Sequence, residues 1–324
     1  MNSFNEIVGH EEIIKHIKSS IKTDKVSHAY MFEGEEGIGK KCLANAFAKT
    51  LQCEEGKDEP CNSCSSCKSF DSQNHPDIKY VVATKKTGIG VDDIREQLNM
   101  DINIKPYRYR YKIYIIEEGD LVTPQAQNAL LKTIEEPPGY GIIIIIAHNS
   151  SRFLPTVLSR CAILSLKPIE EEKIKSYLIE EEKLSQVKAH MYASLSRGNI
   201  GKAKIFLSSI EFEEIRNDII YAIDCIIEEN DLEILEIARK IGEFKEKSDM
   251  ALDLMVTWLR DIMVIKEIND EKYIIHKDKY KTLLKHGQLL SYNRISVLMS
   301  RLEDIQKNIK VNVNYQLSLE TLFF

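Results

Sequence analysis

Two patterns of apolar positions alternate along residues 1–166. Short runs rich in β-branched residues predict buried strands, and stretches in which apolar residues recur every three or four positions predict amphipathic helices. Because strands and helices alternate, the pattern predicts one doubly wound α/β domain around a parallel sheet. The expected strands cover residues 28–32, 78–82, 113–116, 142–147 and 162–166.

Beyond residue 167 the strand pattern stops, and every apolar stripe has helical spacing. We expect an α/β domain over residues 1–167, a small helical domain over residues 168–208 and a longer helical domain over residues 209–324. The stripes of the last domain are explained by a helical core or by a subunit interface used in oligomerisation.

A glycine-rich stretch joins the first expected strand to the helix after it. Gly34, Gly37 and Gly39 allow a turn that aims backbone N–H groups and a helix N-terminus at a phosphate, and Lys40 would reach the outer phosphates. The motif is broken at its last position, because Lys41 replaces the hydroxyl that ligates magnesium. A lysine only donates hydrogen bonds, so it cannot act as a metal ligand there. The stretch predicts P-loop architecture and leaves the binding of ATP and magnesium open.

Acidic residues follow the strand expected at residues 113–116. Glu117 and Glu118 come directly after it, and Asp120 follows shortly. Ligands of parallel α/β sheets bind beyond the carboxyl ends of the strands. We therefore expect a second element of the nucleotide site here, of the kind that binds magnesium and activates water.

Four of the seven cysteines form one group, Cys53-x7-Cys61-x2-Cys64-x2-Cys67. Four thiolates complete a tetrahedral zinc shell and leave no open position for water, so the predicted site is structural rather than catalytic. A chance cluster of unpaired thiols is the alternative, and redox chemistry is disfavoured because an exchange motif needs only two cysteines. The predicted zinc module, residues 53–67, interrupts the α/β pattern and is therefore an insertion.

The net charge of −6 argues against a whole surface that binds nucleic acid. One basic strip, residues 105–112, holds three tyrosines and no acid, and it could contact phosphates and stack on bases. The simpler interpretation is an approach to a strand, with packed tyrosines and solvated arginines. The sequence has no apolar run of about 18 residues and no signal-peptide pattern at its start, so we expect a cytoplasmic protein without membrane contact.

Several motifs together resemble the bacterial DNA polymerase III clamp-loader subunits, which are AAA+ proteins with an α/β domain, a small helical lid and a helical collar. The likeness covers residues 7–10, which read IVGH, the P-loop and the four-cysteine insert. It continues with residues 129–138, which read ALLKTIEEPP, with the triplet at residues 159–161, which reads SRC, and weakly at residues 312–320.

The resemblance assigns roles to particular residues. It implies that Cys53, Cys61, Cys64 and Cys67 are the zinc ligands. It also implies that Arg160, which follows Ser159, is an arginine finger that enters the ATP site of a neighbouring subunit. The implied partners are the gamma/tau and delta subunits of the clamp loader and, through the complex, the sliding clamp and primed DNA.

Three positions depart from the ATP-hydrolysing members of this family. Lys41 replaces the magnesium-binding hydroxyl, Glu117 replaces an aspartate and leaves Glu118 in the usual base position, and Gly201 replaces a lid arginine. Arg160 is intact. The chain therefore resembles the stator type of subunit, which lacks its own activity and completes the site of its neighbour.

Two alternatives remain. The first is an ATP-hydrolysing motor subunit of the gamma/tau type that tolerates the altered loop. The second is an unrelated zinc and nucleic-acid binding module, which leaves Arg160 without a role. The spacing to Arg160 also leaves open whether His148 or Asn149 is the sensor at the end of its strand.

Overall fold

The computed structural model describes residues 3–56, 58–243, 247–268, 270–309, 319 and 322. Apart from residue 319, the weak family likeness at residues 312–320 lies outside these residues. The chain divides into two compact units. Met1–Lys173 and Gly198–Gly201 form the first unit, and Ile174–Arg197 and Lys202–Phe324 form the second. The division into three parts, with a lid over residues 168–208, stays a prediction.

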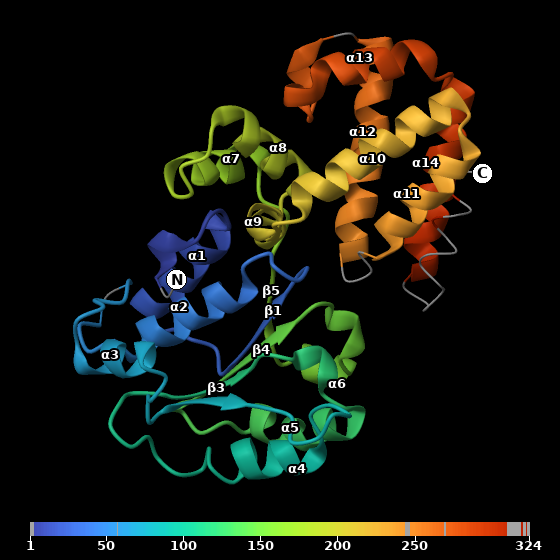
Figure 1. Cartoon of the computed structure of the whole chain (residues 1–324). Helices are drawn as coiled ribbons and strands as arrows, with labels where there is room; N and C mark the ends of the chain where they lie inside the picture. Colours follow the sequence, from blue (N-terminus) through green and yellow to red (C-terminus); the bar gives the residue numbers. More distant parts are fainter. Residues whose placement is uncertain are drawn as a thin grey trace. The chain divides into compact units, whose positions relative to one another are not determined.

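The first unit is built around a five-stranded parallel sheet in the order β2-β3-β4-β1-β5 (Figure 1). Its strands lie within one residue of the expected bounds at either end, and the doubly wound α/β fold is confirmed. The strands are β1 Ala29–Glu33, β2 Ile78–Val81, β3 Lys112–Ile116, β4 Gly141–Ala147 and β5 Ala162–Ser165.

Helices cover both faces of this sheet, which explains why the strands are so continuously apolar. In β4, Ile142 and Ile144 pack in the same core as α1 and α2, whereas Ile143 and Ile145 pack in the core that contains α5 and α6. The helices are α1 Glu11–Lys22, α2 Lys40–Gln52, α3 Ser65–Asp71, α4 Val91–Ile94, α5 Pro124–Glu135 and α6 Pro155–Leu158.

The basic strip is shaped by one buried carboxylate. Asp77, which precedes β2 and is 1% exposed, accepts backbone N–H groups from Tyr107, Arg108 and Tyr109 at 2.5, 2.9 and 3.0 Å. Three N–H groups that converge on one carboxylate bend the backbone into a turn. The strip is therefore a loop folded around Asp77 before β3 begins.

The arginines of this loop lie at the surface in ion pairs. Arg108 pairs with Glu54 at 3.3 Å, and Arg110 pairs with Asp24. This agrees with the simpler interpretation of solvated arginines, because their charges are already balanced by acids. The expectation that all the tyrosines pack is wrong for Tyr107, which is 86% exposed.

In its described residues, the second unit consists of helices and their connections (Figure 1). None of the helices in the described part of the chain is long and apolar enough to cross a bilayer. The remaining helices are α7 Glu171–Glu180, α8 Gln186–Ser196, α9 Ile200–Ser208, α10 Phe212–Glu228, α11 Asp231–Glu243, α12 Ser248–Glu267, α13 Tyr280–Leu289 and α14 Tyr292–Ile309.

Candidate functional site

The turn between β1 and α2 has the backbone shape that its glycines predict. Gly34, Gly37 and Gly39 have φ angles of +149°, +81° and +112°, which L side chains rarely adopt. A Cβ on Gly34 would also lie 2.9 Å from the carbonyl oxygen of Leu166. The backbone therefore requires glycine at these positions, and the P-loop architecture is present.

A pocket of about 620 Å³ opens beside this turn. The turn contributes one wall, and the ends of β3 and β4 contribute the others. The sheet thus brings together nucleotide-site candidates that the sequence predicts in separate segments. The lining includes Gly37, Gly39, Lys40, Lys41, Glu117, Glu118, Asp120, His148 and Arg152.

Lys40 is directed toward the carbonyl groups of its own loop. Its Nζ donates to the backbone oxygens of Gly34 and Glu35, the second at 2.8 Å. Burial lowers the pKa of Lys40, while nearby acids, Asp120 first, oppose that shift. A phosphate that binds here must compete with these two carbonyl groups for the ammonium.

Lys41 and Glu117, two of the positions that depart from the ATP-hydrolysing members, pair with each other. Lys41 Nζ lies 2.8 Å from Glu117 Oε2. In ATP-hydrolysing P-loop proteins, the corresponding hydroxyl and acid hold magnesium. Here the lysine offers no ligand atom in place of the hydroxyl, and its positive charge lies beside the acid that would supply the other ligand, so these residues do not fit a magnesium ion.

Gly201 packs directly on the backbone of the P-loop. Its N–H donates to the Gly37 carbonyl at 3.0 Å, and the side chain of Asn199 donates to the Glu36 carbonyl at 2.7 Å. A Cβ on Gly201 would lie 2.6 Å from Gly37 Cα, closer than such atoms come. The position therefore excludes any side chain in this arrangement, an arginine included.

Polar side chains whose roles the sequence did not indicate hold the loops around the pocket. Asp120 accepts the backbone N–H groups of His148 and Asn149. Glu33, at the end of β1, accepts the Ser150 N–H at 3.1 Å and the hydroxyl of Ser165. Hydrogen bonds from Ser150 and then Ser165 lower the pKa of Glu33. The only available signal was their place at strand ends.

The two sensor candidates differ in orientation. His148 lines the pocket. The Asn149 side chain instead accepts the N–H of Ser151 at 2.9 Å and caps the short turn that follows. Of the two side chains, that of His148 is the one available to a ligand in the pocket.

His10 is a further residue whose role the sequence did not indicate. Its ring Nε2 lies 3.0 Å from the Ile38 carbonyl oxygen, and its own φ angle is +59°. A non-glycine residue in this region of φ is uncommon. The motif at residues 7–10 thus reaches the P-loop through this contact.

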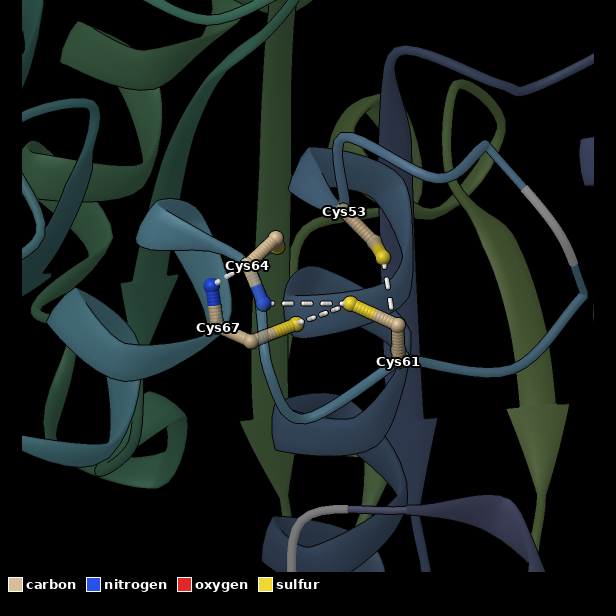
Figure 2. A group of neighbouring side chains, drawn as sticks. All are labelled: Cys53, Cys61, Cys64 and Cys67. Atoms are coloured by element: carbon tan, nitrogen blue, oxygen red, sulfur yellow. Dashed lines mark hydrogen bonds between the residues drawn. The ribbon is translucent and has the colours of Figure 1, made fainter.

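The four grouped cysteines converge on one point (Figure 2). Cys53 follows α2, Cys61 lies in the loop, and Cys64 and Cys67 lie at the start of α3. All four Sγ atoms lie within 4.8 Å of one another, and those of Cys61 and Cys67 are 4.0 Å apart. Four sulfur atoms this close could hold a metal ion, and the set is compatible with zinc.

Backbone N–H groups already point at these sulfur atoms. The N–H groups of Cys61, Cys64 and Cys67 donate to the Sγ atoms of Cys53, Cys61 and Cys64 at 3.3, 3.3 and 3.4 Å. Hydrogen bonds led by the Ser63 side chain lower the pKa of Cys61 to about 6, whereas burial raises the pKa values of Cys53 and Cys67. Such N–H groups orient and stabilise thiolate ligands.

Ion pairs outside the cluster also hold the cysteine loop. The buried Lys49 of α2 places its Nζ 2.8 Å from both carboxylate oxygens of Asp71 and 2.7 Å from Asn62 Oδ1. Glu59 accepts from Ser3 and pairs with Lys18 of α1 at 2.5 Å. The protein therefore fixes the backbone that carries the cysteines.

Arg160 lies in the turn directly after α6, two residues beyond its end, and is partly exposed. Its Nη1 donates to the Thr156 carbonyl at 2.8 Å and to the Ser159 hydroxyl at 3.2 Å. Its Nη2 lies 3.0 Å from Oε1 of Glu135, the last residue of α5. Arg160 does not line the pocket described above.

Fold and site together define a P-loop α/β protein of the AAA+ class with a helical second unit. The family model "DNA polymerase III, delta subunit" matches residues 9–170, and "DNA polymerase III, delta subunit, C terminal" matches residues 209–324. The two matches together cover most of the chain. A delta' subunit is also similar to the chain over nearly the whole length of both proteins. The chain therefore belongs to the delta-prime family of DNA polymerase III clamp-loader subunits.

That relative is DNA polymerase III subunit delta' of Bacillus subtilis, which is 31% identical over 96% of this chain and 94% of its own length. The tau subunit of the same organism is 37% identical, but over 53% of this chain and 30% of its own length. Among solved structures, the Bacillus subtilis DNA clamp loader delta protein covers 96% of this chain and 98% of its own, at 13% identity and a TM-score of 0.38.

We expect Gly201→Ala to destabilise the protein by roughly 1–3 kcal/mol, because its Cβ overpacks the P-loop backbone. Gly139→Ala is the matched control, since a Cβ there meets nothing within 4 Å, and its cost should stay within about 0.5 kcal/mol. Urea unfolding followed by circular dichroism compares the two. Equal stabilities would mean that the Gly201 contact is not tight in solution.

Proposed function

We propose that this chain is a stator-type clamp-loader subunit. It does not hydrolyse ATP at its own P-loop, and it supplies Arg160 to the ATP site of a neighbouring subunit. The contrast between two basic residues carries the proposal. Lys41 is paired with Glu117 inside the chain's own site, whereas Arg160 lies outside that pocket, partly exposed.

The charges of the pocket support the first half of this proposal. Hydrolysis needs a metal ion that neutralises the charge developing on the phosphates. Lys41 offers no metal ligand, its charge beside Glu117 disfavours a divalent cation there, and Gly201 offers no cation from the lid position. Glu118 retains the position of a base, but a base alone does not supply the missing positive charge.

The chemistry of arginine supports the second half. A guanidinium is planar and permanently charged, and its several N–H donors match the oxygens of a phosphate. In the proposed complex, Arg160 meets the transferring phosphoryl group of a gamma/tau-type neighbour and stabilises its transition state. Ser159 fixes one edge of the guanidinium through its hydroxyl. The complex, with its delta subunit, then loads the sliding clamp onto primed DNA.

We further propose that Cys53, Cys61, Cys64 and Cys67 hold one structural zinc ion. The convergence of the four sulfur atoms supports this, and so do the N–H groups directed at them. A shell of four thiolates leaves no position for water. The zinc would stabilise the insert, and no catalytic step passes through it.

The purified chain alone should have negligible ATPase activity, because metal coordination and the lid cation are both missing. Lys41→Thr should free Glu117 and improve binding of magnesium nucleotide without restoring turnover. Lys41→Met removes the same charge but provides no hydroxyl, so it should not improve magnesium-dependent binding as much. Calorimetry with and without magnesium measures binding. Turnover on the order of 1 s⁻¹ by the wild-type chain would favour the motor alternative.

Metal analysis of the purified protein should find about one equivalent of zinc. Cys64→Ser should lower both the zinc content and the resistance of residues 53–67 to protease, because one of four ligands is lost. Cys42→Ser, outside the cluster, should retain the metal. A chelator should loosen the insert but leave the sheet intact. Wild-type protein that takes up no zinc on reconstitution would disprove the proposal.

Arg160→Ala should slow ATP hydrolysis at the one site that it faces, by roughly 10³–10⁵-fold at that site. The loss for the whole complex should be smaller, because other sites keep their own arginines. Arg160→Lys should rescue poorly, since an ammonium lacks the planar fork. ATPase and clamp-loading rates are measured on the reconstituted complex, after assembly has been verified.

Arg95→Ala, which removes an exposed arginine from another part of the first unit, is the control for the Arg160 variants. It should leave both rates unchanged. If the assembled Arg160→Ala complex hydrolysed ATP and loaded clamps at wild-type rates, Arg160 would have only a local structural role.

A further inference from the structure

We infer that Glu135 is a positioning residue for Arg160, so that the last residue of α5 sets the direction in which the guanidinium faces a neighbour. This inference rests on the proposed function of Arg160. Its starting point is the ion pair in which Glu135 Oε1 lies 3.0 Å from Arg160 Nη2.

The guanidinium is held from two sides. On its own segment, Nη1 donates to the Thr156 carbonyl and to the Ser159 hydroxyl. From α5, Glu135 meets the other terminal nitrogen. A guanidinium has five N–H donors in a fixed plane, so two anchored nitrogens define that plane and still leave donors for a phosphate.

The helix that carries the Glu135 carboxylate is itself held in place by hydrogen bonds. Near the start of α5, the buried Gln127 accepts the Leu154 N–H at 2.8 Å and donates to the Arg152 carbonyl at 3.2 Å. These bonds tie α5 to the turn from which α6 begins. The Glu135–Arg160 pair ties the two segments together again at their far ends. A helix anchored at its start carries its last residue to a defined position.

The end of α5 is also fixed in the sequence. Pro137 and Pro138 cannot continue the helix, so Glu135 is its last residue and the Glu136 N–H closes on the Lys132 carbonyl at 3.1 Å. Glu136 is exposed, as Glu135 is, but it is not the partner of Arg160. The two neighbouring acids therefore provide a matched pair for an experiment.

The exposure of the Glu135–Arg160 pair indicates that Glu135 orients the guanidinium and does not withhold it from a phosphate. The side chains of Arg160 and Glu135 are 37% and 45% exposed. Ion pairs this exposed are weak, so a phosphate can compete easily with Glu135 for the guanidinium. A weak contact still reduces the number of rotamers that a long side chain samples before it meets its target.

The test uses the full chain in the reconstituted clamp-loader complex, with ATP hydrolysis followed in a single turnover. Glu135→Gln should slow the phase that belongs to the faced site by roughly 2- to 5-fold, and the nucleotide concentration that gives half the maximal single-turnover rate should stay unchanged. Glu135→Asp, which keeps the charge, should lose less. Glu136→Gln removes the same charge one position away and should match the wild type.

A double variant separates positioning from a general structural effect. Glu135→Gln added to Arg160→Ala should cause no further loss, because Glu135 acts through Arg160. A further loss of rate in the double variant would overturn the inference. Faster hydrolysis by Glu135→Gln would also overturn it, because the ion pair would then inhibit hydrolysis. A wild-type rate for Glu135→Gln with a slow Arg160→Ala would overturn the positioning role alone. Wild-type rates for both would overturn the proposed function itself.

Discussion

The parallel pairing of β1 with β4 and β5 determines where the candidate site forms. In this pairing Glu33 is level with Ala147 on one side and Ser165 on the other. The segments that follow these strands must therefore meet at one edge of the sheet, and the pairing of β3 with β4 adds Glu117 to it. Both faces of β4 are buried, so a shift of one residue in register would move each side chain to the opposite core. The chemistry of the edge thus depends on packing inside the sheet.

Much of this arrangement follows from sequence patterns because those patterns are local. Strand and helix periods, the glycines of the P-loop and the spacing of the cysteines each arise within short segments. Contacts between distant segments produce no local pattern in the sequence. Asp77 gives no sign that it will accept three N–H groups from residues 107–109, and Gly201 gives no sign that its Cα will rest on Gly37. Such contacts depend on how the completed fold brings surfaces together.

The contact between Gly201 and Gly37 gives a second reason why position 201 has no side chain. The family resemblance implies only that glycine at position 201 lacks a cation. In the folded chain, the same glycine lets two backbone segments touch, with a hydrogen bond from its N–H to the P-loop. Restoring an arginine would thus require the P-loop or its neighbour to move. Close backbone packing and the absence of a cation are thus two consequences of the same residue.

Two ion pairs in the first unit use similar charges with opposite consequences. Lys41 meets Glu117 through one compact ammonium, and the carboxylate so engaged is the one that a metal ion would need. Arg160 meets Glu135 through one nitrogen of a planar group that has further donors in the same plane. Under the proposed function, the first pair therefore places a positive charge where a metal ion would bind, and the second leaves its cation able to bind a phosphate. The difference comes from the geometry of the two basic side chains and from their location, one inside the pocket and one outside it.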